Sequence, residues 1–301
     1  MTATDIPPAL TAAAPAAAGA VSPGRLAARR FFRHRLAVAG LVMLGLFALA
    51  AIVLPWFLGT DPNQVVPTAI RQAPGGDHPL GTDSAGRDVL ARLLVGGRIS
   101  LLVGLSSALV ATVIGLTLGA VAGYFGRWVD GILSRFGDVV LAFPSLIVII
   151  VVAAFVGPSL PTLILSIGLF GWPTPFRIVR GLTLSLREQD SLVAVAGLGA
   201  GPARILRKHV VPVVIAPLTV VATLAVAQAI LLEATVSFLG LGVPPPTASW
   251  GNMLNDAQSL TILETMPWLW LPPGIAIALT VLAVNFVGDG LRDAADPRRG
   301  R

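Results

Sequence analysis

"ISLLVGLSSALVATVIGLTLGAVAGY" (residues 99–124) contains no charged side chain. About 20 apolar residues in a helix are enough to cross the hydrocarbon core of a bilayer. The run is longer than that, so it predicts a transmembrane helix. The fold class of the whole chain depends on this stretch and on others like it.

Similar apolar runs recur along the chain. Hydrophobic residues make up 55% of the sequence and charged residues only 12%, about half the charged share of a soluble domain. We therefore predict an all-α polytopic membrane protein with about six transmembrane helices. The predicted spans are Leu36–Leu58, Ile99–Tyr124, Ile132–Val156, Leu160–Ile178, Val213–Leu239 and Trp268–Gly288.

The fourth span contains two prolines, Pro173 and Pro175. Proline removes a backbone donor, so this helix is expected to kink or end there, against protein rather than lipid.

Basic residues indicate the orientation. Five precede the first span, two follow the second, six follow the fourth and four follow the sixth, which places 17 of the 21 Lys and Arg on one side. By the positive-inside rule both termini are cytoplasmic. The basic residues form no single stripe, so nucleic acid is not expected as a partner. The absence of Cys excludes disulfides and thiolate metal sites.

These features divide the chain into four parts. They are a disordered cytoplasmic tail at 1–30, a first span with an external loop and amphipathic helix at 31–97, a transmembrane core at 98–290 with a cytoplasmic loop at about 183–211, and a cytoplasmic tail at 291–301.

The long loop between the fourth and fifth spans, residues 183–211, reads "TLSLREQDSLVAVAGLGAGPARILRKHVV". Its pattern predicts a helix, a turn of small residues and a second helix. Gly199 and Gly201 would permit a sharp reversal of the backbone. The first helix would either lie on the lipid surface or dock into a soluble partner.

This loop resembles the coupling loop of bacterial ABC-importer permeases, whose pattern is Glu-Ala-Ala, three residues, Gly, nine residues, a variable apolar residue and Leu-Pro. Val193 replaces the family glutamate and Val195 replaces the second alanine, and Glu188 or Asp190 could supply the missing acid. The resemblance implies that these residues contact an ATPase: Glu188, Asp190, Val193, Ala194, Val195, Gly199, Ala200, His209 and Pro212.

Further blocks extend the resemblance over residues 25 to 298. "HPLGTDSAGRDVLARLLVGGRISLLVG", "YFGRWVDGILSRFGDVVLAFPSL", "EATVSFLGLGVPPPTASWGNML" and "FVGDGLRDAADPR" are similar to the second permease subunit of dipeptide, oligopeptide and nickel-type importers. This implies a type I ABC importer permease fold in a bacterial inner membrane.

The resemblance also implies partners: a related permease in a heterodimer, two cytoplasmic ATPases and an extracytoplasmic substrate-binding protein. ATP closes the ATPase pair, which opens the permease outward, and hydrolysis resets it. ATP and Mg would bind those ATPases, so this chain is expected to be non-catalytic and to hold no cofactor. No G-x-x-x-x-G-K-[ST] motif occurs in it.

The expected substrates are di- and oligopeptides, with nickel chelates and glutathione-like molecules as alternatives. An ion-coupled secondary transporter is the alternative from another class, and a membrane-embedded enzyme is a third. The three histidines form no recognisable metal motif, so no metal site is predicted.

Glu233 is the one acid deep in an apolar run, and Gln228 and Ser237 lie near it. A charge in hydrocarbon is costly, so the carboxylate should face protein or water. The three residues either line an outer cavity or gate of the translocation path, or Glu233 is a hydrogen-bonded structural carboxylate between helices.

Residues 78–100 mix His, Asp and Arg ahead of the second span. Thr82, Asp83 or Ser84 is expected to cap a helix that lies on the outer surface and turns into the membrane at Gly96 and Gly97. Asp88 and Arg92, four apart, are expected to pair. Trp250, Trp268 and Trp270 are predicted as interfacial anchors. The predicted external shoulder, bracing a gate or meeting the binding protein, comprises Asp83, Arg87, Asp88 and Trp250.

Overall fold

The computed structural model describes residues 23–59 and 61–295, which are helical apart from their connections and contain no strand. Five helical segments are long and apolar enough to cross a membrane, and counting the bent pair α4–α5 as one span gives six, so the predicted fold class is confirmed. The main helices are α1 (Pro23–Arg33), α2 (Arg35–Leu58), α3 (Val89–Phe125), α4 (Arg127–Ala142), α5 (Ser145–Val156), α6 (Leu160–Gly171), α7 (Pro173–Arg187), α8 (Asp190–Gly197), α9 (Pro202–Ile205), α10 (Val211–Phe238), α11 (Trp250–Asn255), α12 (Leu260–Thr265) and α13 (Pro267–Ala295).

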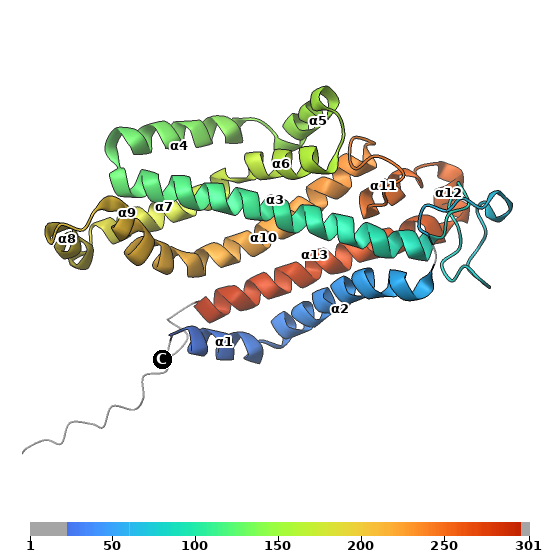
Figure 1. Cartoon of the computed structure of the whole chain (residues 1–301), viewed down its shortest axis with the longest axis horizontal. Helices are drawn as coiled ribbons and strands as arrows, with labels where there is room; N and C mark the ends of the chain where they lie inside the picture. Colours follow the sequence, from blue (N-terminus) through green and yellow to red (C-terminus); the bar gives the residue numbers. More distant parts are fainter. Residues whose placement is uncertain (1–22, 60, 296–301) are drawn as a thin grey trace, which may run out of the picture.

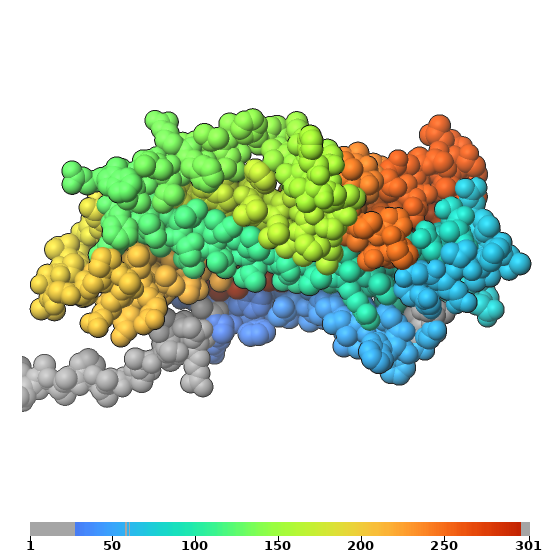
Figure 2. Space-filling model, turned by 45° about the horizontal axis from the view of Figure 1, so that its top comes forward, coloured from blue at the N-terminus to red at the C-terminus, as the bar shows by residue number. Residues whose placement is uncertain are grey.

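The long helices lie side by side along one axis (Figure 1). α3 runs the length of the bundle and packs against α6, α7 and α10, while α2 pairs with α13. One end of the bundle carries α1, α8, α9 and the end of α13, and the other carries α11, α12 and residues 61–88 (Figures 1 and 2). The predicted coupling loop and outer stretch therefore lie at opposite ends.

The described start of α3 differs from the expected one. The Asp88 carboxylate caps the helix by accepting the Ala91 amide at 2.7 Å, and α3 continues without a turn through Gly96 and Gly97. A side chain added at Gly96 would lie 3.2 Å from the Ser249 backbone, and one at Gly97 would lie 3.0 Å from the Trp250 ring. The prediction of a separate surface helix is wrong, because these glycines admit α11 rather than a bend.

The third span is two helices, not one straight helix. α4 and α5 meet at an angle of 81°. Phe143 between them has φ −98° and ψ 133°, and it precedes Pro144, whose ring disfavours a helical conformation in the residue before it. The sequence prediction of one span over 132–156 overlooked this proline.

The predicted interruption of the fourth span is confirmed. α6 ends at Gly171 and α7 begins at Pro173, with both Pro173 and Pro175 buried against protein. Glycines spaced four apart on α3 allow this close contact: an added Cβ at Gly119 would lie 2.8 Å from the Phe176 carbonyl oxygen. Small residues at this spacing are a common means of bringing membrane helices together.

Helical structure extends into both predicted tails. Residues 23–30, predicted to be disordered, belong to α1, and α13 continues to residue 295. Residues 1–22 and 296–301 lie outside the described part of the chain.

Candidate functional site

A turn at residues 83–87 organises the end of the bundle that carries α11 and α12 (Figure 1). Asp83 Oδ1 accepts the amides of Ala85 and Arg87, each at 2.9 Å, and Asp83 Oδ2 accepts Arg87 Nε at 2.7 Å. Arg92 Nε lies 3.5 Å from the same carboxylate. Asp83 therefore closes a turn and neutralises two arginines, and the prediction that it or a neighbour caps the helix is wrong.

Asp256, which follows α11, joins this turn from another part of the chain. Its Oδ2 lies 3.0 Å from Arg87 Nη2 and 3.7 Å from Arg92 Nη2. Partial burial raises the pKa of the Asp256 carboxyl above its ordinary value, and attraction to the two arginines opposes that rise. A pocket of about 150 Å³ lies beside these groups and is also lined by Ser237 and Asn252.

Asp88 does not pair with Arg92 as predicted. Its Oδ2 lies 2.8 Å from His78 Nδ1, while its Oδ1 caps α3. The helix cap orients the carboxylate toward the loop that precedes it. Asp88 thus fixes the loop at residues 61–88 to the first turn of α3.

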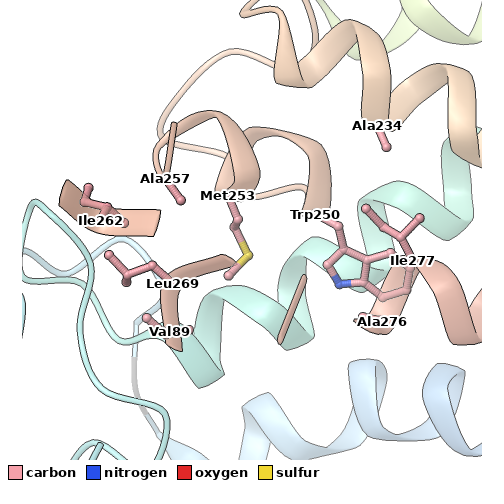
Figure 3. Close-up of a cluster of buried hydrophobic side chains, with 9 residues drawn as sticks. All are labelled: Val89, Ala234, Trp250, Met253, Ala257, Ile262, Leu269, Ala276 and Ile277. Carbon is pink, nitrogen blue, oxygen red and sulfur yellow. The ribbon is translucent and has the colours of Figure 1, made fainter. Parts of the chain in front are cut away.

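Trp250 is only 2% exposed and lies in the cluster of apolar side chains at this end (Figure 3). Its Nε1 donates to the Leu93 carbonyl at 3.0 Å. The interpretation of Trp250 as an interfacial anchor or a contact for another protein is wrong, because its ring packs between α11, α3 and α13.

Glu233 connects three helices. The carboxylate is fully buried, and it accepts Ser100 Oγ from α3 and Ser237 Oγ from its own helix, α10, each at 2.8 Å. Ser100 Oγ in turn accepts the Trp250 amide of α11 at 3.3 Å. Of the two interpretations of Glu233, the geometry matches the structural carboxylate.

A cavity of about 490 Å³ opens between α3, α4, α5, α6, α7 and α10. Gln228 lines this cavity, whereas Ser237 lines the smaller pocket beside Asp256 and Glu233 lines neither. The three residues predicted for one path are therefore separated. Sequence inspection missed three polar side chains of the cavity wall, Ser107, Ser145 and Thr174, because nothing in an apolar run shows which of its faces meets a cavity.

The loop at the other end has the predicted helix–turn–helix form, with α8 followed by α9 and a π-helical turn, Leu206–Val210. Leu192 anchors it in the core, whereas Val193 is 58% and Leu198 is 88% exposed. Gly199 makes the reversal, with φ +81°. Gly201 has φ −68°, so the prediction that it also needs glycine's freedom is wrong.

The other residues predicted for this loop follow its course. Glu188 directly follows α7 as its C-cap, and Asp190 begins α8, which contains Ala194 and Val195. Ala200 lies in the turn, His209 in the π-helical turn and Pro212 in the first turn of α10. Within the described residues, no group of three or more His, Asp or Glu side chains is arranged to hold a metal ion.

Two family descriptions match this sequence. Residues 115–301 match the binding-protein-dependent transport system inner membrane component, and residues 22–74 match the N-terminal transmembrane domain of oligopeptide transport permease C.

Individual proteins agree with the family match. A protein of Brucella suis, provisionally named a peptide permease protein, is 48% identical over 92% of this chain and 91% of its own. A dipeptide transport system permease protein of Alkalihalophilus pseudofirmus is 40% identical over 93% of this chain and 91% of its own.

The fold has a solved counterpart. A chain of the MetNI methionine ABC transporter, solved in inward-facing conformations, superposes with a TM-score of 0.51 at 19% identity, covering 67% of this chain and 95% of that chain. At that identity the likeness supports the fold alone. On the strength of the family match and the close relatives, this chain belongs to the inner-membrane permeases of binding-protein-dependent ABC transport systems.

Proposed function

We propose that the chain is one permease subunit of a heterodimer that imports di- or oligopeptides into the bacterial cytoplasm. Two ATPase subunits on the α8–α9 side would supply the energy, and a binding protein would deliver the substrate to the opposite end. ATP and Mg belong to the ATPases in this proposal, and this chain binds no cofactor. The end that carries α1, α8 and α9 is then cytoplasmic, in agreement with the positive-inside rule.

The exposed face of the α8–α9 loop is the observation that carries this proposal. Val193 and Leu198 present apolar surface beyond the ends of the membrane helices, while Leu192 ties α8 to the core. An exposed apolar side chain on a loop anchored in this way suits a complementary groove on a soluble partner. Because residue 193 is valine where the family pattern has glutamate, its contact with the ATPase would be apolar.

A charge in this face tests the contact. Leu198→Asp should reduce ATPase co-purification and ATP-driven uptake at least tenfold while the melting temperature stays unchanged. Leu260→Asp is the matched control for ATPase co-purification, since Leu260 is 77% exposed at the opposite end of the bundle, away from the proposed ATPase contact. Full ATPase binding by Leu198→Asp would contradict docking through this loop.

Reconstitution tests the transport activity itself. The chain should be placed in liposomes with the related permease, the two ATPases and the binding protein, and uptake of a labelled dipeptide measured. Uptake should require ATP and the binding protein. Uptake driven by an ion gradient in liposomes that hold this chain alone would instead identify a secondary transporter.

The names of the relatives support peptides as substrates, since both the Brucella and the Alkalihalophilus proteins are named for peptide or dipeptide transport. Nickel chelates and glutathione-like molecules are the alternatives within the same class of importer. Competition of labelled dipeptide uptake by glutathione or by a nickel–histidine chelate distinguishes them.

A further inference from the structure

The membrane cavity has an uncharged wall. About 490 Å³ is within the range of roughly 300–1,000 Å³ typical of small-molecule sites. Most of the lining side chains are apolar, and none of the lining residues in the described part of the chain is charged. The polar groups are the hydroxyls of Ser107, Ser145 and Thr174 and the amide of Gln228, which come from four different helices: α3, α5, α7 and α10.

Ser107 is the unusual member of this set. Its side chain is fully buried, and its Oγ has no hydrogen-bond partner within the described residues. Other hydroxyls in these helices bond to the carbonyl one turn earlier, as Thr117 does to Val113 at 2.9 Å and Thr235 does to Leu231 at 2.7 Å. A buried hydroxyl without a partner costs stability, so each such group calls for an explanation.

The position of Ser107 explains why its hydroxyl has no partner in the described part of the chain. Four buried side chains lack a hydrogen-bond partner among the described residues, namely Ser107, Thr112, Trp268 and Thr280. Of these, only Ser107 lines the cavity. Its hydroxyl can donate one hydrogen bond and accept others, and the Gln228 amide can do both as well. Together the two residues offer donors and acceptors without a net charge.

We propose that this cavity is a substrate-contact site that binds the peptide backbone through Ser107 and Gln228 and has no preference for either sign of side-chain charge. The inference rests on the proposed peptide-import function and deepens it. Neutral donors and acceptors match backbone amide and carbonyl groups, which every peptide carries. Because the cavity wall carries no fixed charge, it has no charge–charge interaction that would favour cationic over anionic side chains.

Ser107→Ala separates this role from a structural one. Removing a buried hydroxyl that has no protein partner should leave the melting temperature unchanged or raise it. The KM for ATP-driven uptake of labelled alanyl-alanine should nevertheless rise about fivefold, the loss expected for one neutral hydrogen bond of about 1 kcal/mol. Thr112→Val is the matched control, because it also removes an unpartnered hydroxyl of α3 but lies outside the cavity wall.

Charged substitutions at Gln228 test the second half of the proposal. Gln228→Glu should favour a lysine-containing dipeptide over a glutamate-containing one by roughly tenfold relative to wild type, and Gln228→Lys should reverse the preference. Binding-protein selectivity cancels in this comparison, since all variants use the same binding protein.

The outcomes are distinct. If the wild-type complex shows no ATP-dependent dipeptide uptake, the proposed function fails. If it transports but Ser107→Ala matches Thr112→Val in KM, or both Gln228 variants keep the wild-type charge ratio, the cavity proposal alone is overturned.

Discussion

Arg98 Nε of α3 donates a hydrogen bond to the Ala51 carbonyl oxygen of α2, the carbonyl that Pro55 leaves without its usual helical donor. In an α-helix this oxygen would accept the amide of the residue four positions later, and proline has no amide hydrogen. Arg98 Nη2 also donates to the Ile52 carbonyl at 2.9 Å. The guanidinium thus replaces the missing donor and fastens α2 to α3.

Arg98→Ala should therefore destabilise the protein by about 1.5–3 kcal/mol, the value of hydrogen bonds to a charged group. Pro55→Ala restores the amide to Ala51 and should recover part of that loss in the double variant. Thermal unfolding of the four proteins in detergent gives the coupling energy. Arg135→Ala, at an exposed position on α4, is the control and should change stability by less than about 0.5 kcal/mol. Strictly additive effects of Arg98→Ala and Pro55→Ala would contradict the replacement.

Glu233 should tolerate glutamine better than alanine. Glu233→Gln keeps an oxygen and an amide that can bond Ser100 and Ser237, so dipeptide uptake should stay within about twofold of wild type. Glu233→Ala leaves the buried Ser100 and Ser237 hydroxyls without the acceptor to which they donate, and it leaves a cavity, so it should cost about 2–5 kcal/mol. Glu264→Ala, at an exposed acid of α12, should be neutral in unfolding measurements. Loss of uptake by a stably folded Glu233→Gln would show that the carboxylate acts in transport.

Gly119→Ala should disrupt the contact between α3 and α7. The added Cβ would lie 2.8 Å from the Phe176 carbonyl oxygen and 2.9 Å from Val179 Cβ, so the helices must separate, at a cost of about 1–3 kcal/mol. Gly181→Ala on α7 is the matched control, because its Cβ would meet nothing within 4 Å. Alanine is the better helix former, so this control should gain up to about 1 kcal/mol. Equal melting temperatures for the two variants would contradict the packing argument.

Asp83 and Asp256 should differ in their effect on stability although both contact Arg87. The Asp83 side chain is 9% exposed and also accepts two backbone amides, whereas Asp256 is 36% exposed. Asp83→Ala should cost about 3–5 kcal/mol, because it removes the nearest counter-charge of the buried arginines and the acceptor of the two turn amides. Asp256→Ala should cost less than about 1 kcal/mol, as for a partly exposed ion pair. Chemical denaturation of both variants checks the order, and a larger loss for Asp256→Ala would reverse it.

Features that depend on neighbouring residues are predictable from the sequence, whereas features that depend on distant residues are not. The apolar run at 99–124 predicted its span, and Pro173 marked the break in the fourth span, because both features act through neighbouring residues. Pro144 is a signal just as local, and it marks the break between α4 and α5. Gly96 and Gly97 predict a bend from the sequence, and that prediction is wrong because the groups they accommodate, the backbone of Ser249 and the ring of Trp250, lie about 150 residues away in the chain.

The amino-acid sequence by itself determined the fold class, the apolar segments long enough to span a membrane, the helix–turn–helix form of the 183–211 loop and the permease family. Hydrophobic length, proline and the order of motifs are properties of contiguous residues. Only the tertiary structure decided that Glu233 bonds Ser100, that Trp250 is buried, and that Ser107 and Gln228 line one cavity. These relationships join helices far apart in the chain, and in an apolar helix the packing of neighbouring helices determines which face meets protein, lipid or a cavity.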